Sequence, residues 1–134
     1  MEIKANELRL GNLLTLNDKV RQELFNNEIH ARNKYFKVLT IYSDGDILLE
    51  LDDENVEIDI KDIEPIPLTE EWLLKLGFKR FPWGLVIGEL LFKDDLKCNE
   101  LTLEIGNGFR VKNKHVHQLQ NLYFALTNEE LIIK

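Results

Sequence analysis

Three consecutive strand patterns in the first half of the sequence constrain the fold more than any other feature. Residues 35–42 and 47–51 are rich in aromatic, β-branched and aliphatic side chains, and Asp44-Gly45 between them is a strong hairpin signal. After a turn of mostly acidic residues, residues 56–61 alternate apolar with charged side chains. This alternation is the period of a strand with one buried face. The pattern therefore predicts two successive antiparallel hairpins with one apolar face and one charged face.

A fourth strand pattern, residues 13–16, precedes these hairpins and ends at the turn pair Asn17-Asp18. In residues 19–33 apolar side chains at helical spacing are interrupted by Asn26-Asn27. They predict a long excursion between strands, with a short helix as the alternative. The four strands together predict a small, strongly bent SH3-like antiparallel sheet or barrel over residues 1–64.

The second half of the chain alternates helix and strand patterns. Pro65 and Pro67 end the first sheet, because proline supplies no donor to a strand ladder. Thr69 is placed to cap a helix, and Gly77 lies where the end of that helix needs a left-handed residue. Further patterns predict strands over 78–81, 85–87, 90–92, 101–105 and 109–112, a final helix over 115–126, and one last turn started by a Thr127/Glu130 capping box.

These patterns predict an α+β protein: an SH3-like N-terminal sheet, followed by a unit of helix, antiparallel strands and helix. At 134 residues the chain has the size of one domain, and its balance of 44% apolar and 31% charged residues is that of a folded protein. We therefore expect a single compact domain over residues 1–134, with subdivisions at 1–64 and 65–134.

The acidic residues are strongly partitioned along the chain. Residues 44–64 contain ten acidic side chains and one basic one, Lys61, a formal charge of −9, whereas the whole chain carries −7 with a pI near 5.0. A chain polarised in this way can present an anionic surface to a cationic partner. The acidic pI argues against generic binding of nucleic acid, because phosphate contacts need a basic surface.

The sequence also bears on the compartment. No apolar run is long enough to span a bilayer, and the N-terminal residues lack the apolar core of a signal peptide. The single cysteine, Cys98, cannot form an intramolecular disulfide. Together these features predict a protein of a reducing cytoplasm.

Three segments carry a resemblance to a known family. They are LRLGN at 8–12, PIPLTEEWLLKLGF at 65–78 and VHQLQNLYFALT at 116–127. With these segments the chain resembles a family of small uncharacterised proteins from phages and mobile elements of Bacteroidetes. The resemblance implies a phage or prophage context and hence the cytoplasm of a bacterial host. Small acidic proteins from that context are often antagonists of host defence, and some inhibit a CRISPR effector or another nuclease.

The leading functional hypothesis is therefore a non-enzymatic interaction protein, an anti-CRISPR-like inhibitor of a host defence nuclease or its RNA complex. Its carboxylates would pair with arginine and lysine on the partner, and Phe81 and Trp83 would anchor the contact, since tryptophan is enriched at binding hot spots. The alternatives are a solvated charged face and a Trp83 that closes the core beneath its turn. The predicted acidic set comprises Asp44, Asp46, Glu50, Asp52, Asp53, Glu54, Glu57 and Asp59, and the same run continues to Asp62 and Glu64.

A nucleic-acid-associated accessory protein is the second hypothesis. It uses a basic set made of Lys34, Lys37, Arg110, Lys112 and Lys114. No cofactor or metal is expected: the acidic residues do not fit the spacing of a calcium loop, and His115 and His117 lack a third zinc ligand. Cys98 lies in a polar stretch with no neighbouring base that could activate it as a nucleophile. We find no other catalytic motif in the sequence. Tyr35, Phe36, Leu24 and Phe25 are further apolar interface candidates.

Overall fold

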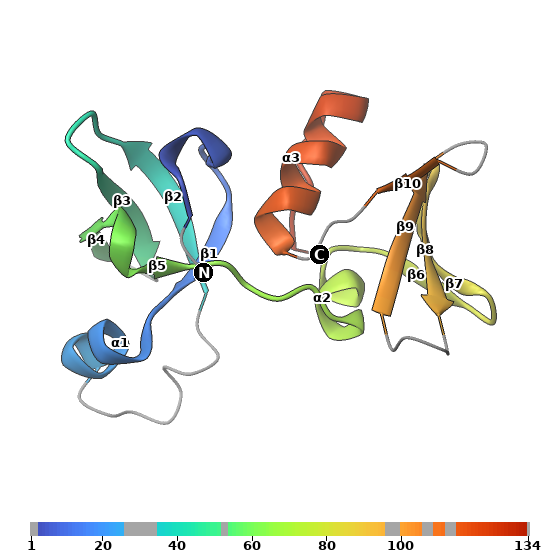
Figure 1. The fold of residues 1–134 in the computed structure, drawn as a ribbon, viewed down its shortest axis with the longest axis horizontal. Coiled ribbons are helices and arrows are strands. Elements are labelled where there is room, and N and C mark those ends of the chain that lie inside the picture. Colours follow the sequence, from blue (N-terminus) through green and yellow to red (C-terminus); the bar gives the residue numbers. More distant parts are fainter. Residues whose placement is uncertain are drawn as a thin grey trace. The chain divides into compact units, whose positions relative to one another are not determined.

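The computed structural model describes residues 3–25, 35–51, 54–95, 100–105, 109–111 and 115–133. In this part of the chain the fold is α+β, with two five-stranded antiparallel sheets and three α-helices (Figure 1). The chain divides into two compact units, residues 1–66 (the N-terminal unit) and residues 67–134 (the C-terminal unit). The α+β class and the antiparallel sheets are confirmed, and the packing of both units as a single compact domain stays a prediction.

The N-terminal unit is a sheet in the order β4-β3-β2-β1-β5. Consecutive strands β2, β3 and β4 pair as hairpins, and the last strand returns to pair with the first. The predicted strands are present, except that the last two residues of the strand predicted over 56–61 belong to a 3₁₀ helix. The elements are a 3₁₀ turn (Ala5–Glu7), β1 (Leu13–Leu16), α1 (Asp18–Phe25), β2 (Phe36–Ile41), β3 (Asp46–Leu51), β4 (Glu54–Asp59), the 3₁₀ helix η3 (Ile60–Asp62) and β5 (Ile63–Glu64).

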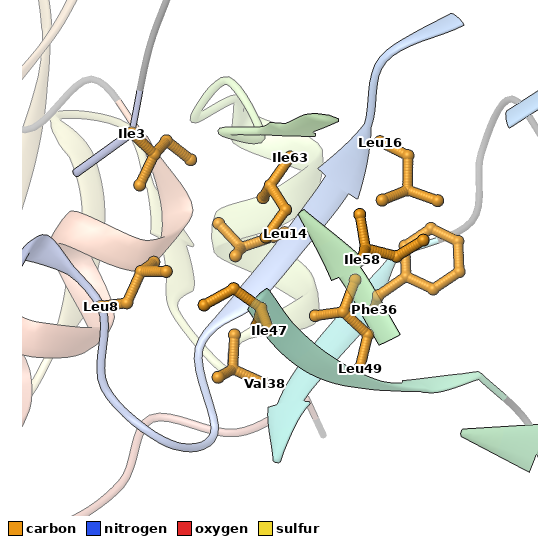
Figure 2. Close-up of a cluster of buried hydrophobic side chains, with 10 residues drawn as sticks. All are labelled: Ile3, Leu8, Leu14, Leu16, Phe36, Val38, Ile47, Leu49, Ile58 and Ile63. Atoms are coloured by element: carbon orange, nitrogen blue, oxygen red, sulfur yellow. The ribbon is translucent and has the colours of Figure 1, made fainter. Parts of the chain in front are cut away.

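One face of this sheet forms an apolar core, because successive side chains of a strand point to opposite faces. Phe36 and Val38 of β2 are buried, as are Ile47 and Leu49 of β3. Figure 2 shows these side chains gathered with others from neighbouring strands and from the N-terminal segment. The cluster consists of Ile3, Leu8, Leu14, Leu16, Phe36, Val38, Ile47, Leu49, Ile58 and Ile63.

Helix α1 lies in the long connection between β1 and β2 and confirms the short-helix alternative for its first part. The pair Asn17-Asp18 begins a helix and not a turn: the Oδ1 atom of Asn17 accepts a hydrogen bond from the Val20 N–H at 2.9 Å, as a helix N-cap does. The Nδ2 atom of Asn17 also donates to Oδ1 of Asp62 at 3.2 Å. Asn17 thus ties the start of α1 to η3. Residues 26–33 of the predicted excursion lie outside the described part.

Replacing Asn17 by Ala is expected to destabilise the protein by about 1–2 kcal/mol, because it removes both the N-cap and the bond to Asp62. Asn17→Ser keeps a cap acceptor and loses only the contact with Asp62, so it should lie between the wild type and Asn17→Ala. Urea unfolding followed by far-UV circular dichroism measures the series. Asn55→Ala, at an exposed position of β4, is the matched control; equal losses in Asn17→Ala and Asn55→Ala would contradict the capping role.

The N-terminal segment is fixed by a fully buried asparagine. Asn12 accepts the Arg9 N–H at its Oδ1 atom at 2.7 Å, and its carbonyl oxygen accepts the Val38 N–H at 2.9 Å. Gly11, between them, has φ +92°, a conformation that favours glycine. The LRLGN segment is therefore a structural turn that joins the N-terminal residues to β2.

The C-terminal unit is a meander in the order β10-β9-β8-β7-β6, accompanied by two helices (Figure 1). Its buried residues include Leu73 of the first helix, Leu76 at the C-cap of that helix, and Phe92 of the sheet. The rings of Phe78 and Phe92 pack edge to face, with their centroids 5.6 Å apart. The elements are α2 (Glu70–Lys75), β6 (Lys79–Phe81), β7 (Gly84–Ile87), β8 (Leu90–Asp95), β9 (Glu100–Ile105), β10 (Phe109–Val111) and α3 (Val116–Thr127).

The ends of α2 are as predicted. The Thr69 hydroxyl accepts the Trp72 N–H at 3.3 Å, and Gly77 follows the helix with φ +97°. The end of α3 differs from the prediction. Thr127 is the last residue of α3 and donates its hydroxyl to the Tyr123 carbonyl at 2.7 Å, so it does not start a further turn. Asn128 ends the helix in the left-handed conformation instead.

Candidate functional site

Five residues of the acidic set have described side chains, and four of them lie on one face of the β3–β4 hairpin. Ile47 and Leu49 of β3 point into the core, so the alternate residues Asp46 and Glu50 point outward. The same argument applied to buried Ile58 places its neighbours on the outer face. This outer hairpin face comprises Asp46, Leu48 and Glu50 from β3 and Asn55, Glu57 and Asp59 from β4.

The strand register sets the spacing of these carboxylates. Asp46 lies directly opposite Asp59, and Glu57 lies opposite Leu48. Side chains directly opposite each other have Cβ atoms about 4.5–5.5 Å apart, and like charges in such a pair are destabilising. The Asp46/Asp59 pair therefore concentrates negative charge at the end of the hairpin nearest the β2–β3 turn.

Some predicted acidic residues stabilise the local backbone. The Oδ1 atom of Asp44, in the β2–β3 turn, accepts the Asp46 N–H at 3.0 Å. Asp59 caps η3 by accepting the Lys61 N–H at 3.0 Å, and its Oδ2 atom lies 3.8 Å from the Lys61 ammonium. By contrast, Glu57 is exposed and forms no ion pair within the described residues. Asp52 and Asp53 lie outside the described residues, as does the side chain of Glu54.

The basic set divides between the two units, and three of its five residues lie outside the described part of the chain. Lys37 lies on β2 opposite Glu50, with its Nζ atom 3.8 Å from the Glu50 Oε2 atom. Arg110 belongs to β10 in the other unit, where its backbone is in register with Glu104. Lys34, Lys112 and Lys114 lie outside the described residues. The one basic side chain whose surroundings are described is thus partly neutralised by a carboxylate of the outer hairpin face.

The negative charge belongs to one unit. Residues 1–66 contain eight basic and fifteen acidic side chains, a formal −7, whereas residues 67–134 contain nine of each and are neutral. The entire net charge of the chain therefore lies in the unit that carries the outer hairpin face. A field of this kind attracts cationic partners to that unit and falls off within about 8–10 Å at physiological salt.

The C-terminal unit exposes a pair of stacked aromatic rings at the turn between β6 and β7. Trp83 is 59% exposed and Phe81 36% exposed. Their ring centroids lie 4.9 Å apart with an interplanar angle of 15°. Trp83 therefore lies at the surface and does not close the core beneath its turn, and the interface role of the pair stays a prediction. Phe36, another apolar candidate, is buried in the core.

Two residues of the aromatic turn explain its conformation. Phe81 and Gly84 are register partners, so only Pro82 and Trp83 form the loop. Proline fixes φ near −65° and suits the first position of such a turn. A Cβ on Gly84, which has φ +153°, would overlap the carbonyl oxygen of Phe92 on the neighbouring strand. The aromatic turn, Phe81 to Gly84, is therefore held rigidly against β8.

A cation beside this turn was not among the predicted site residues. Lys79 lies two residues before Phe81 on β6, so both side chains point to the same face of the sheet. Lys79 is exposed and has no ion pair within the described residues. Arg80 points to the opposite face, where its Nε atom lies 3.4 Å from the Glu70 Oε1 atom. Alternation of Lys79 with Phe81 was the sequence signal that could have identified this site.

His115 and His117 lie on either side of the first residue of α3. His117 is 2% exposed on α3, and its ring stacks on that of His115 with centroids 5.9 Å apart. Within the described residues, no three histidine, cysteine or carboxylate side chains are grouped as metal ligands. Cys98 lies outside those residues.

No protein-family model, no curated protein and no solved structure matches this chain. In the described part of the chain no helix has the length and apolar character needed to cross a membrane. Any function must therefore be argued from the surfaces above.

Proposed function

We propose that this chain is a non-enzymatic interaction protein of a phage or mobile element that binds a cationic surface of a host protein. The partner surface is that of a defence nuclease, of the CRISPR effector kind, in the host cytoplasm. The contact is made by the outer hairpin face of the N-terminal unit. The observation that carries the proposal is the juxtaposition of Asp46 and Asp59 across β3 and β4, with exposed Glu57 on the same face.

The cost of this arrangement supports the proposal. Like charges directly opposite each other oppose strand pairing, and the exposed ion pair between Asp59 and Lys61 contributes at most about 1 kcal/mol. Local features that weaken a fold are expected at functional sites. An arginine or lysine of a partner placed between the two carboxylates would relieve the repulsion through charge-assisted hydrogen bonds.

The charge partition supports the same partner chemistry. All of the net negative charge lies in the N-terminal unit, so a cationic groove would be steered toward it during encounter. A nuclease groove that binds nucleic acid has this cationic character, and carboxylates can replace phosphates there. The outer hairpin face offers carboxylates on two adjacent strands, which is a surface and not a point contact.

We also propose that the N-terminal unit is an SH3-like barrel. Its five antiparallel strands follow the order β4-β3-β2-β1-β5, with the 3₁₀ helix η3 before the last strand. Pairing of β5 with β1 places the last strand of this unit beside its first strand, as in a small bent sheet of this kind. This fold would hold the β3–β4 hairpin as a rigid, twisted ribbon for docking.

Replacing Glu57 by Lys is expected to reduce recovery of the host partner at least about tenfold, because it puts a cation against a cationic surface. Glu57 is a cleaner choice than Asp59, since Asp59 also caps η3. The measurement is a pull-down with the tagged full chain from a Bacteroidetes host lysate, with and without nuclease, read by mass spectrometry. Glu129→Lys changes net charge equally at an exposed position of the C-terminal unit and should leave recovery unchanged.

The proposal requires a specific host protein whose recovery resists nuclease, declines with salt and is lost only in Glu57→Lys. Recovery of nucleic acid alone, or of partners that disappear after nuclease treatment, would overturn it. If only nucleic acid is recovered, the accessory-protein hypothesis expects that neutralising Lys112 and Lys114 of the basic set abolishes the recovery of nucleic acid.

A further inference from the structure

The aromatic turn of the C-terminal unit has features that the proposed function does not use. Single exposed apolar side chains are common at protein surfaces. Here two large rings are exposed next to each other and are already stacked at 4.9 Å. Phe81 stacks on one face of the Trp83 indole, and 59% of the Trp83 surface stays exposed, which leaves area for contact with a further ring.

The rings need little ordering before they bind. Phe81 is held in the β6–β7 ladder by its pairing with Gly84, and Pro82 restricts the loop between them. Gly84 in turn approaches the Phe92 carbonyl so closely that no side chain fits. Preorganised groups lose less conformational entropy on binding than mobile ones. The backbone is therefore restricted on both sides of Trp83, and stacking on Phe81 orients the indole platform.

The charge beside the platform indicates which ring it accepts. Lys79 is exposed on the same face as Phe81, about 6.8 Å along the strand from it, and forms no ion pair within the described residues. Arg80, whose cation is compensated by Glu70, faces the other way. An unpaired nucleotide carries both groups that this site complements, a flat base and an anionic phosphate.

We infer that the aromatic turn binds single-stranded nucleic acid, with one base stacked on Trp83 and the adjoining phosphate paired with Lys79. A duplex is a poorer ligand because its bases already stack on each other and their faces are covered. Every base has a π-face, so the site is tolerant of sequence. This site lies in the neutral C-terminal unit and uses no residue of the acidic surface in the proposed function.

The test is a titration of the full chain, carrying Trp72→Phe so that Trp83 is the only tryptophan, with 12-nucleotide oligo(dT) at low salt. We expect quenching of Trp83 fluorescence, and weaker quenching with a duplex of equal length. The same affinity measured by fluorescence anisotropy of labelled oligo(dT) should fall about 5- to 100-fold in Trp83→Leu. Circular dichroism of each variant verifies that it is folded.

Lysine variants test the phosphate contact. Lys79→Gln should reduce the slope of log affinity against log salt by about 0.7, the value for one phosphate contact with a single strand. Lys61→Gln, at an exposed lysine of the other unit, should leave the slope unchanged. Absence of oligo(dT) binding, or binding that is the same in Trp83→Leu and the parent, would overturn the inference. Both of these results would leave the proposed function standing, because that proposal is tested separately by the loss of the host partner in Glu57→Lys.

Discussion

Gly84→Ala is expected to destabilise the C-terminal unit by roughly 3 kcal/mol or more. The added Cβ would overlap the Phe92 carbonyl oxygen and lie 3.1 Å from its carbonyl carbon and 3.2 Å from Leu91 Cδ1. The first two atoms are backbone of β8, which cannot rotate away, so β7 and β8 must separate. Strained φ and overpacking each cost on the order of 1–3 kcal/mol. Urea unfolding followed by tryptophan fluorescence measures the loss, because Trp72 and Trp83 both belong to this unit.

Gly88→Ala is the matched control for this substitution. Gly88 also has a positive φ, +53°, but a Cβ there would meet no atom within 4 Å. Its replacement should cost only the backbone strain of a left-handed residue, about 1–2 kcal/mol. If the two variants were equally stable, close packing of Gly84 against β8 would be wrong. The rigid presentation of the aromatic turn would then lose its support as well.

Alternating strands were the part of the fold that the sequence predicted best. Buried Ile58 and its exposed neighbour Glu57 follow a period of two, which only a half-buried strand requires. The two-residue strand β5 was not predicted, because two residues carry no period. Its place is set by pairing with β1, which lies far away in the sequence.

Helix α1 was predicted only as an alternative, for a different reason. Asparagine followed by aspartate suits both a turn and a helix N-terminus, so Asn17-Asp18 alone does not decide between them. The backbone N–H of Asn17 donates to the Asp62 carbonyl at 3.0 Å, and the side chains of the same two residues are also bonded. Contacts across 45 residues therefore favour the helix, and no local pattern contains them.

The sequence predicted which residues belong to the candidate acidic site, but it did not predict how their side chains are arranged. The run of carboxylates in the sequence is divided by the strand period and the turns. Asp46 and Glu57 lie on the outer hairpin face, whereas Asp44 bonds to the backbone of its turn and Asp62 bonds to Asn17. Which carboxylates lie opposite each other depends on the register of β3 and β4. The exposure of Trp83 likewise depends on where its turn lies relative to the core.

The segments that carry the family resemblance contain structural residues. Asn12 bonds the N-terminal turn to β2, Thr69 caps α2, and Gly77 ends it. Gln120, buried on α3, donates its Nε2 to the Leu131 carbonyl at 3.3 Å and holds the C-terminal segment. Each of these residues therefore stabilises the local backbone of its segment.

Phe36→Ala is expected to destabilise the N-terminal unit by about 3–5 kcal/mol, the range for removing a buried phenylalanine. Phe36 is 1% exposed, pairs with Leu14 across β1 and β2, and lies in the core cluster with Leu49 and Ile58 (Figure 2). Removal of its ring leaves a cavity bordered by strands that cannot all move inward. Urea unfolding followed by far-UV circular dichroism measures the loss.

Tyr42→Ala is the control for Phe36→Ala, because it removes a ring that is 40% exposed and should cost less than about 1 kcal/mol. Tryptophan fluorescence in the same experiment reports only on the C-terminal unit, which contains both tryptophans. If the chain is one cooperative domain, as the sequence predicts, the fluorescence transition of Phe36→Ala shifts to lower urea together with the dichroism transition. A fluorescence transition that stays at the wild-type midpoint would show that the two units unfold independently, and the acidic surface and the aromatic turn would then be separate modules.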